Sequence, residues 1–556
     1  MRIVMVGGVA GGMSAAARAR RLDENAEIIV FERGEHPSFA NCGLPYYVSG
    51  EIEDEASLLV QTPESLKAAL NIDVRIKHEV IGVDPTAQTV QVRNWGAPDA
   101  PVTDWEYDAL ILSPGAVALR PPLPGLDSPR VQTLRTVGDA VTLRDEVDSG
   151  ATRAVVLGAG FIGLEAAEGL RMQGLSVDVV ELAPHVLPPL EAEMAALIQD
   201  ELATMGITVH AGVAATEIET GSDADTVILA DGTRITADVI VLSVGVRPDT
   251  AAFEAAGVAC ERGAIVVDEH GRTNLDRVWA VGDATVSTDS VTGLRRPVAL
   301  AGPANRAGRL VADHIVNPST ARPIPHPVGT AIVRVGSLTA AMTGANRSAL
   351  DAAGIDYATV HLHPGSHAGY FPGAEQIHLL MHIRRSDGLI LGAQATGIDG
   401  VDKRIDVLAT AIRAGMTGPD LIDLDLAYAP PFGSAKDPVN MAGMIAENVI
   451  NGSLKLWYAD QIDESGFLLL DVRGPDEQDE DPVPGALCIP HTEVRDRLDD
   501  IREAAAGQPI RVLCASGVRS YLAYRVLRGA GLDAANLSGG LLTLRATERL
   551  AELQPA

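Results

Sequence analysis

Cysteine is scarce in this sequence, which has four cysteines among 556 residues, at positions 42, 260, 488 and 514. They are far apart, and no two of them form a C-x-x-C pair. Thiols so few and so scattered exclude a disulfide framework. We therefore expect a protein of the reducing cytoplasm, and we assign no metal site.

Positive charge and long apolar runs are also lacking. The chain has 44 Lys and Arg residues against 74 Asp and Glu, a formal net charge of -30, which repels nucleic-acid phosphates. The apolar stretch at residues 3–6 ends at glycines and is too short for a signal peptide or a membrane span. We expect neither a nucleic-acid partner nor a membrane, and an anionic ligand needs a local basic pocket.

The length and the apolar content indicate several domains. With 46% hydrophobic residues and no long polar tract, a chain of this size should bury several cores and divide into about three or four domains.

The N-terminal segment has the pattern of a βαβ unit. An apolar strand at 3–6 leads into a glycine turn at 7–12, a helix that ends near Arg21 and a second strand at 27–31, which is followed by Glu32. Glycines in such a turn let the backbone approach a pyrophosphate at the helix N-terminus, and the acid suits a ribose hydroxyl. The segment is predicted to bind a dinucleotide.

The same pattern returns in the middle of the chain. A strand at 154–157 leads into 158–163, which matches G-x-G-x-x-G fully, and Glu181 follows a strand at 176–180. Glu181 would repel a ribose 2′-phosphate, and no base stands beside it, so this second unit is predicted to prefer NADH to NADPH.

Three further strands end in small-residue turns, at 110–115, at 241–248 and at 279–284, the last in Gly-Asp. This order of motifs resembles the pyridine nucleotide–disulfide oxidoreductases, over roughly residues 1–450. The resemblance implies FAD on the first unit, NADH on the second and a C-terminal dimerisation domain. It also implies that Asp283 holds the ribityl chain of the flavin.

The resemblance assigns residues to both cofactors. Those for FAD are Gly7, Gly8, Ala10, Gly11, Gly12, Glu32, Arg33, Asn41, Cys42, Val80, Ser113, Gly115, Asp283 and Ala301. Those for NADH are Gly158, Gly160, Ile162, Gly163, Glu181 and Gly245.

Cys42 has no second cysteine nearby. Glutathione- and lipoamide-type reductases use a pair separated by four residues, and Tyr47 stands where the second would be. A single thiol can form a mixed disulfide with substrate or a sulfenic acid. The candidates are therefore the coenzyme A-disulfide reductases and the NADH oxidases and peroxidases. The peroxidases typically carry a histidine where this chain has Ala10.

The segment 38–47 resembles that of coenzyme A-disulfide reductases, in which the cysteine attacks the substrate sulfur. There, Ser38 and Asn41 would line the substrate site. Two downstream segments resemble those that bring Tyr370 and Tyr428 from the partner subunit to the cysteine, where a phenol can protonate a departing thiolate. The alternative is that both tyrosines only pack at a dimer interface.

Coenzyme A carries several phosphate charges and needs local cations. The candidates are Arg18, Arg20, Arg21 and Lys67. Arg18 and Arg21 share a helix face and could clamp a phosphate, and the resemblance favours them; the alternative is an ordinary solvated face.

The last hundred residues contain a second thiol motif. Cys514 follows a strand at 510–513 and opens the loop C-A-S-G-V-R-S, which with the preceding L-L-L-D-V-R and P-G-A resembles a rhodanese domain. In rhodaneses the loop wraps backbone N–H groups around the sulfur, and Cys514 and Arg519 fill the active positions. Cys260 and Cys488 have no such setting. The acidic run 476–481 is predicted to be a solvated loop.

The predicted fold class is α/β, with two Rossmann-like domains, an α+β dimerisation domain and an α/β rhodanese domain. The predicted boundaries are 1–118 and 247–321 for FAD, 119–246 for NADH, 322–450 for dimerisation and 459–556 for the rhodanese.

The predicted protein is a homodimer that reduces coenzyme A persulfide or disulfide, with polysulfide as a further acceptor, and that transfers sulfane sulfur through Cys514. Its partners are small thiols, disulfides and persulfides. The main alternative is an NADH oxidase or peroxidase with a sulfenic acid at Cys42, and a sulfur-carrier or redox-sensing protein is the alternative outside the enzymes.

Overall fold

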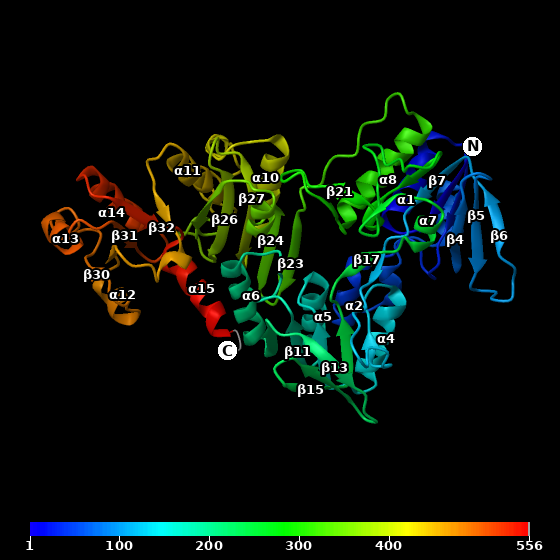
Figure 1. Cartoon of the computed structure of the whole chain (residues 1–556), viewed down its shortest axis with the longest axis horizontal. Coiled ribbons are helices and arrows are strands. Elements are labelled where there is room, and N and C mark those ends of the chain that lie inside the picture. The colour runs from blue at the N-terminus through cyan, green and yellow to red at the C-terminus, as the bar shows by residue number, and fades with distance from the viewer. Residues whose placement is uncertain (554–556) are drawn as a thin grey trace. The chain divides into compact units, whose positions relative to one another are not determined.

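A computed structural model describes residues 1–553, which form two compact units (Figure 1). The first unit consists of Met1–Leu182 and Gly206–Pro327. The second consists of Ala183–Met205 and the chain from Val328 onward.

The first unit opens with a parallel sheet of five strands. Their order is β20 (Val278–Ala280), β7 (Ala109–Leu112), β1 (Arg2–Val6), β2 (Glu27–Phe31) and β3 (Asp73–Arg75). Helix α1 (Ala10–Leu22) packs against α8 (Ala301–Val316). Their approach depends on Gly308, because a side chain there would collide with the Gly11 carbonyl. The predicted first βαβ unit is confirmed.

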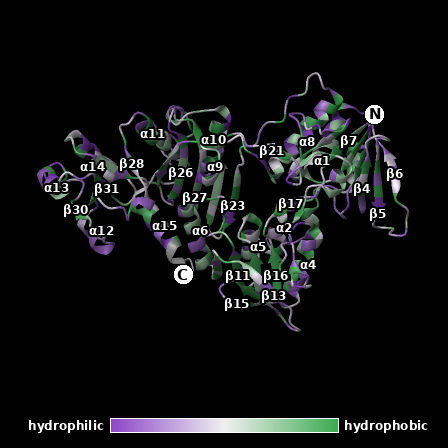
Figure 2. Ribbon diagram, viewed as in Figure 1, coloured by the Kyte–Doolittle hydropathy of each residue, from purple (hydrophilic) through white to green (hydrophobic). Residues whose placement is uncertain are grey.

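A second parallel sheet in this unit contains the other predicted βαβ unit. Its order is β12 (Ile207–Ala211), β11 (Ser176–Glu181), β10 (Arg153–Leu157), β16 (Val239–Leu242) and β9 (Val131–Gln132). Helices α5 (Phe161–Met172) and α4 (Val137–Asp148) accompany it. The central strands β10 and β16 are nearly continuous apolar runs, as expected for a sheet covered on both faces, and Figure 2 shows the apolar character of this sheet.

Short elements complete the first unit. The strands are β4 (His78–Asp84), β5 (Thr89–Asn94), β6 (Thr103–Glu106), β8 (Ala116–Ala118), β13 (Ala215–Glu219), β14 (Asp225–Leu229), β15 (Arg234–Ala237), β17 (Val246–Pro248), β18 (Cys260–Glu261), β19 (Ala264–Ile265), β21 (Val286–Thr288) and β22 (Arg295–Pro297). The helices are α2 (Leu44–Val48), α3 (Pro63–Leu70) and α7 (Ala251–Ala255), with 3-10 turns at Asn41–Gly43, Glu55–Leu58 and Gly282–Ala284.

The second unit has an antiparallel sheet with the order β23 (Ala331–Val335), β24 (Leu338–Gly344), β27 (Ile390–Gly397), β26 (Ile377–Arg384) and β25 (Tyr357–Leu362). Helices α10 (Val401–Ala414) and α11 (Pro438–Ile450) bury an apolar core against it. Helix α6 (Ala192–Thr204) also packs on this sheet, although it lies within the segment predicted to bind NADH. The short helix α9 spans Arg347–Ala352.

A parallel sheet follows in the same unit. Its order is β28 (Leu456–Trp457), β32 (Ala534–Leu537), β31 (Ile510–Leu513), β29 (Leu468–Asp471) and β30 (Leu487–Cys488). The accompanying helices are α12 (Pro475–Glu480), α13 (Leu498–Ala505), α14 (Val518–Gly529) and α15 (Gly540–Leu553). The predicted fold class is confirmed in all four parts.

Candidate functional site

The first glycine turn is held by the acid that follows the second strand. Glu32 is buried, and its two carboxylate oxygens accept hydrogen bonds from the Gly8 and Gly34 N–H groups, both at 2.7 Å. Gly7 has φ +93°, and a side chain there would collide with the Ser113 carbonyl. Helix α1 has no side-chain cap at its N-terminus. Its first N–H groups are therefore left to water or to a ligand anion.

The second turn is built in the same way. The Glu181 carboxylate accepts a hydrogen bond from the Ala159 N–H at 2.7 Å, and Gly158 has φ +100°. Helix α5 begins after Gly160 without a side-chain cap. A side chain at Gly160 would meet open space, unlike one at Gly163, which would collide with the Gly158 carbonyl. The open side of this turn leaves room for a pyrophosphate.

Asp283 lies at the carboxyl end of the first sheet, in the turn after β20. Because parallel strands end at one edge, Asp283 shares this edge with the glycine turn and with Ser113. Burial raises the pKa of Asp283, and Arg135, whose guanidinium lies 3.7 Å away, opposes this effect. A ligand hydroxyl would give this carboxylate the hydrogen bond that compensates its burial.

The remaining predicted cofactor residues take several positions. Arg33 forms an ion pair with Asp249. Val80 is buried in β4, so only its backbone is available to a ligand. The others lie at element ends or turns: Ala10, Ala301 and Ile162 in first helical turns, Gly115 after β7 and Gly245 after β16.

Cys42 is exposed and lies in the 3-10 turn that precedes α2. The following helix packs closely on α5, and the Tyr46 hydroxyl lies 3.3 Å from the Glu165 carboxylate. Partial burial and then the negative charge of Glu165 raise the pKa of the Cys42 thiol. The surrounding protein alone therefore disfavours the thiolate, and a nucleophilic Cys42 needs an added positive or electron-withdrawing group nearby.

The two predicted tyrosines meet, although 57 residues separate them in the chain. Their hydroxyls are 2.9 Å apart, and both are exposed, Tyr370 at 76% and Tyr428 at 47%. The buried guanidinium of Arg404 fixes their loops, because it binds Asp437 at 2.9 Å and the Ser366 carbonyl at 2.8 Å. Exposed aromatic groups held in one place suit a surface that another molecule covers.

The predicted phosphate-binding residues differ in availability. Arg18 forms an ion pair with Asp313 at 2.6 Å, the Lys67 ammonium donates to Asn71 at 2.7 Å, and Arg21 is exposed. Arg20 was a wrong candidate. Its side chain is buried and donates to four backbone carbonyls, those of Leu70, Asp23, Glu24 and Asn71.

The second thiol lies at the N-terminal end of α14. Cys514 is buried at the end of β31, and its sulfur accepts hydrogen bonds from the Ser520 N–H at 3.3 Å and the Ser520 hydroxyl at 3.2 Å. Gly517 has φ +89° and lets the loop turn into the helix. Backbone and hydroxyl donors aimed at one sulfur stabilise a thiolate.

The acidic run 476–481 was predicted to be a solvated loop, and this prediction is wrong. Most of the run belongs to helix α12, which is stabilised by carboxylates in its first turn. The Glu477 side chain accepts from the Gly474 N–H at 3.1 Å and forms a two-point ion pair with Arg519, at 2.5 and 2.6 Å. The prediction failed because the pairing partner lies 42 residues away in the chain.

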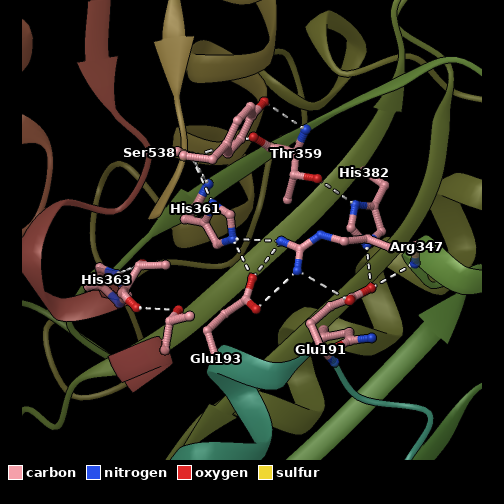
Figure 3. Close-up of polar contacts among 12 residues, drawn as sticks. Glu191, Glu193, Arg347, Thr359, His361, His363, His382 and Ser538 are labelled. Atoms are coloured by element: carbon pink, nitrogen blue, oxygen red, sulfur yellow. Dashed lines mark hydrogen bonds and ion pairs between the residues drawn. The ribbon is translucent and has the colours of Figure 1, made fainter. Parts of the chain in front are cut away.

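A buried polar cluster joins the parallel sheet of the second unit to its antiparallel sheet (Figure 3). His361 Nε2 lies 2.8 Å from Glu193 and its Nδ1 lies 2.7 Å from the Ser538 hydroxyl. Arg347 binds Glu193 at 2.6 Å and Glu191 at 3.3 Å. Burial alone would raise the pKa of Glu193, but His361 and Arg347 hold this pKa well below its usual range.

Three residues that were not assigned to a site from the sequence interact with its candidates: Ser520 and Glu477 through hydrogen bonds, and Glu165 through its charge. Ser520 stands in the quoted loop motif, so its place after Cys514 was a usable signal. Glu165 lies only two residues beyond Gly163 in α5, which puts the two residues on different faces of the helix, so the glycine motif gave no signal for it. Glu477 has no comparable signal. Over residues 1–553, no cluster of three His, Cys, Asp or Glu residues is placed to hold a metal, and no helix is long and apolar enough to cross a membrane.

Residues 1–308 match the pyridine nucleotide-disulphide oxidoreductase family, residues 330–438 match its dimerisation domain, and residues 455–546 match the rhodanese-like domain. The chain belongs to the pyridine nucleotide-disulphide oxidoreductase family. It is a flavoprotein oxidoreductase that carries a sulfurtransferase-like domain, and the family uses FAD with a pyridine nucleotide. The predicted resemblance and enzyme class are confirmed.

Relatives cover most or all of the chain. A coenzyme A disulfide reductase of Staphylococcus haemolyticus is 35% identical over 450 residues, which are 81% of this chain and 100% of that protein. The reduced CoADR-RHD of Bacillus anthracis is 40% identical with a TM-score of 0.95, covering 99% of this chain and 98% of its own. An NAD-dependent persulfide reductase from A. fulgidus is 35% identical with a TM-score of 0.91, covering 98% and 100%.

Proposed function

We propose that this protein is a homodimeric, FAD- and NADH-dependent reductase of coenzyme A persulfide or disulfide, joined to a sulfurtransferase that works through Cys514. One observation carries the proposal: the chain holds two thiols in separate settings. Cys42 is exposed beside the nucleotide-type helix α5, and Cys514 is enclosed by donors at the head of α14. The two solved structures named above extend over both parts of this chain, whereas the Staphylococcus haemolyticus relative matches only the reductase part.

The residues at both glycine turns fit their dinucleotides. The uncapped N-termini of α1 and α5 suit the pyrophosphates, Asp283 suits the ribityl chain, and we assign Glu32 and Glu181 to the ribose hydroxyls. Bound FAD supplies two-electron chemistry between a nicotinamide and a thiol. Because Glu181 would repel a 2′-phosphate, we propose NADH as the preferred donor.

At the first thiol, the Cys42 thiolate attacks the outer sulfur of coenzyme A persulfide. The sulfur–sulfur bond of the substrate breaks, a new one forms on Cys42, and coenzyme A leaves as a thiolate. Tyr428 of the partner subunit, oriented by Tyr370, donates its proton to this thiolate. Two electrons from NADH then return the Cys42 persulfide to a thiolate with release of sulfide. Ser38, Asn41, Arg18, Arg21 and Lys67 are proposed to hold the substrate.

Paired variants test the division of labour. We expect Cys42→Ser to abolish NADH-linked sulfur reduction and to leave sulfane-sulfur transfer to cyanide intact. Cys514→Ser should abolish sulfane-sulfur transfer to cyanide and leave NADH-linked reduction of ready-made coenzyme A persulfide intact, because that reduction needs no second thiol. Equal loss of both activities in either variant would contradict the proposal. Oxygen consumption that depends on Cys42 would instead support a sulfenic acid oxidase. The cytoplasmic location and the domain boundaries stay predictions.

A further inference from the structure

The cation of the Cys514 loop already has a partner. Arg519 donates two nearly parallel hydrogen bonds to Glu477, at 2.5 and 2.6 Å, the geometry in which a guanidinium binds a carboxylate most tightly. The hydrogen bond from Arg519 lowers the pKa of Glu477 to about 2, so the carboxylate is ionised throughout the physiological range. Glu477, followed by Cys514 at a smaller scale, raises the pKa of Arg519. Both hydrogen bonds described for the guanidinium therefore go to the carboxylate.

Two further arginines of this domain also form ion pairs with carboxylates. Arg473 is buried and binds Asp471 at 2.8 Å, and Arg545 binds Asp481 at 2.6 Å. Helix α12, which carries Glu477, bears three further acids, Asp476, Asp479 and Glu480. Around Cys514, the described side chains therefore present balanced ion pairs with an acidic helix beside them, and they offer little attraction to a doubly charged anion.

Sulfur donors differ in where their charge lies. In thiosulfate, two negative charges are spread over the sulfane sulfur and the sulfonate group bonded directly to it, so the whole dianion must enter the loop. In an organic persulfide, the neighbouring sulfur is bonded to carbon, and any further charge lies at a distance. Only the first donor needs Arg519 to be released from Glu477.

We propose that Glu477 is a specificity-determining residue of the Cys514 site: by holding Arg519 it disfavours dianionic donors such as thiosulfate and leaves the site to organic persulfides. This inference rests on the proposed sulfurtransferase activity. In the transfer, the Cys514 thiolate attacks the outer sulfur of the persulfide, the donor's sulfur–sulfur bond breaks, and the organic thiol leaves as a thiolate. Cys514 then carries the persulfide, and no net oxidation or reduction occurs.

The test uses the full-length, flavin-loaded protein with cyanide as sulfur acceptor. Thiocyanate formation is measured with thiosulfate and with the persulfide of mercaptoethanol, which has no sulfonate and carries at most one negative charge. The wild type should have the higher kcat/KM with the persulfide. In Glu477→Gln, the ratio of kcat/KM for thiosulfate to that for the persulfide should rise about tenfold, since a charge-assisted pair is removed. The rise should come mainly from a lower KM for thiosulfate, which a merely loosened loop would not produce.

Asp479→Asn is the matched control. It removes one negative charge from the same helix, and Asp479 is exposed and makes no described contact with Arg519. The donor ratio in this variant should stay within about twofold of the wild type, because a solvated charge at this distance is screened. A wild-type preference for thiosulfate, an unchanged ratio in Glu477→Gln, or equal shifts in the two variants would overturn the inference. Absence of transfer from either donor in wild type would instead refute the proposed sulfurtransferase itself.

Discussion

The hydroxyl of Ser538 lies 2.7 Å from Nδ1 of His361, so the residue that precedes the glycine pair under the Cys514 loop is bound to the antiparallel sheet of the same chain. Ser538 is followed by Gly539 and Gly540, and the next residue, Leu541, donates to the Cys514 carbonyl at 2.9 Å. A side chain at Gly539 would collide with the Thr543 hydroxyl and with the Cβ atom of His361. The rhodanese-like domain is therefore seated on the dimerisation domain by specific contacts.

Replacing Ser538 tests this seating. We expect Ser538→Ala to lower the free energy of unfolding by about 1–3 kcal/mol, because a buried ring nitrogen of His361 loses its hydrogen-bond partner. Amide hydrogen exchange should quicken in β25 and at the start of α15. Thr547→Ala is the control, since that half-buried hydroxyl bonds only within α15. Unchanged exchange in Ser538→Ala would show that the contact does not hold the domain.

Glu193 should make the second unit sensitive to acid. Its folded pKa lies well below the ordinary value of 4.5, so its stabilisation is fully present above about pH 4.5 and is lost as the pH falls toward the folded pKa. Glu193→Gln should lower the unfolding free energy by roughly 3 kcal/mol at pH 7, because it leaves Arg347 with one fewer buried carboxylate.

The difference between Glu193→Gln and wild type should shrink on acidification below pH 4.5, as followed by thermal unfolding. Asp387→Asn is the control, since Asp387 forms its ion pair with Arg384 at the surface. A gap that stays constant from pH 7 to about pH 3 would contradict an ionised Glu193.

Glu165 should tune the first thiol. Since its charge raises the pKa of Cys42, Glu165→Gln should lower that pKa and shift the pH profile of Cys42 alkylation to lower pH. The measurement is the rate of iodoacetamide labelling of residue 42, read by peptide mass spectrometry. Cys488, which lies in the other unit, provides an internal control because its profile should not move. A shift to higher pH would show that Glu165 acts otherwise than through its charge.

Phenylalanine variants of Tyr370 and Tyr428 should distinguish proton donation from packing at the dimer interface. If Tyr428 protonates the leaving thiolate, Tyr428→Phe should lower kcat for persulfide reduction about a hundredfold and leave the dimer intact. Tyr370→Phe should have the smaller effect, because Tyr370 only supports Tyr428 through the 2.9 Å hydrogen bond. Weaker dimerisation with unchanged kcat, measured by sedimentation and steady-state turnover, would favour the packing alternative.

Much of this architecture could be predicted from the sequence, because its signals are local. The strands at 27–31 and 510–513 coincide with β2 and β31, since apolar runs bounded by turns specify buried parallel strands. The meeting of Tyr370 with Tyr428, by contrast, was predicted only through family resemblance.

Pairings between distant residues left no local signal. Glu477 and Arg519 are 42 residues apart in the chain. Arg20 stands among other arginines, and nothing in the local sequence indicates that its side chain is buried and donates to backbone carbonyls. The hydrogen bond between His361 and Ser538 joins residues that are 177 apart in the chain, and it depends on how two domains pack. Such contacts follow from tertiary packing, which periodicity and spacing do not encode.

The most direct test of the central claim is anaerobic NADH oxidation by the purified protein, with coenzyme A persulfide or coenzyme A disulfide as acceptor and sulfide assayed in parallel. We expect fast turnover with the persulfide and one sulfide released for each NADH oxidised. A clear preference for the disulfide would make this chiefly a thiol-maintenance reductase. Turnover with neither acceptor would show that the protein is not the proposed reductase.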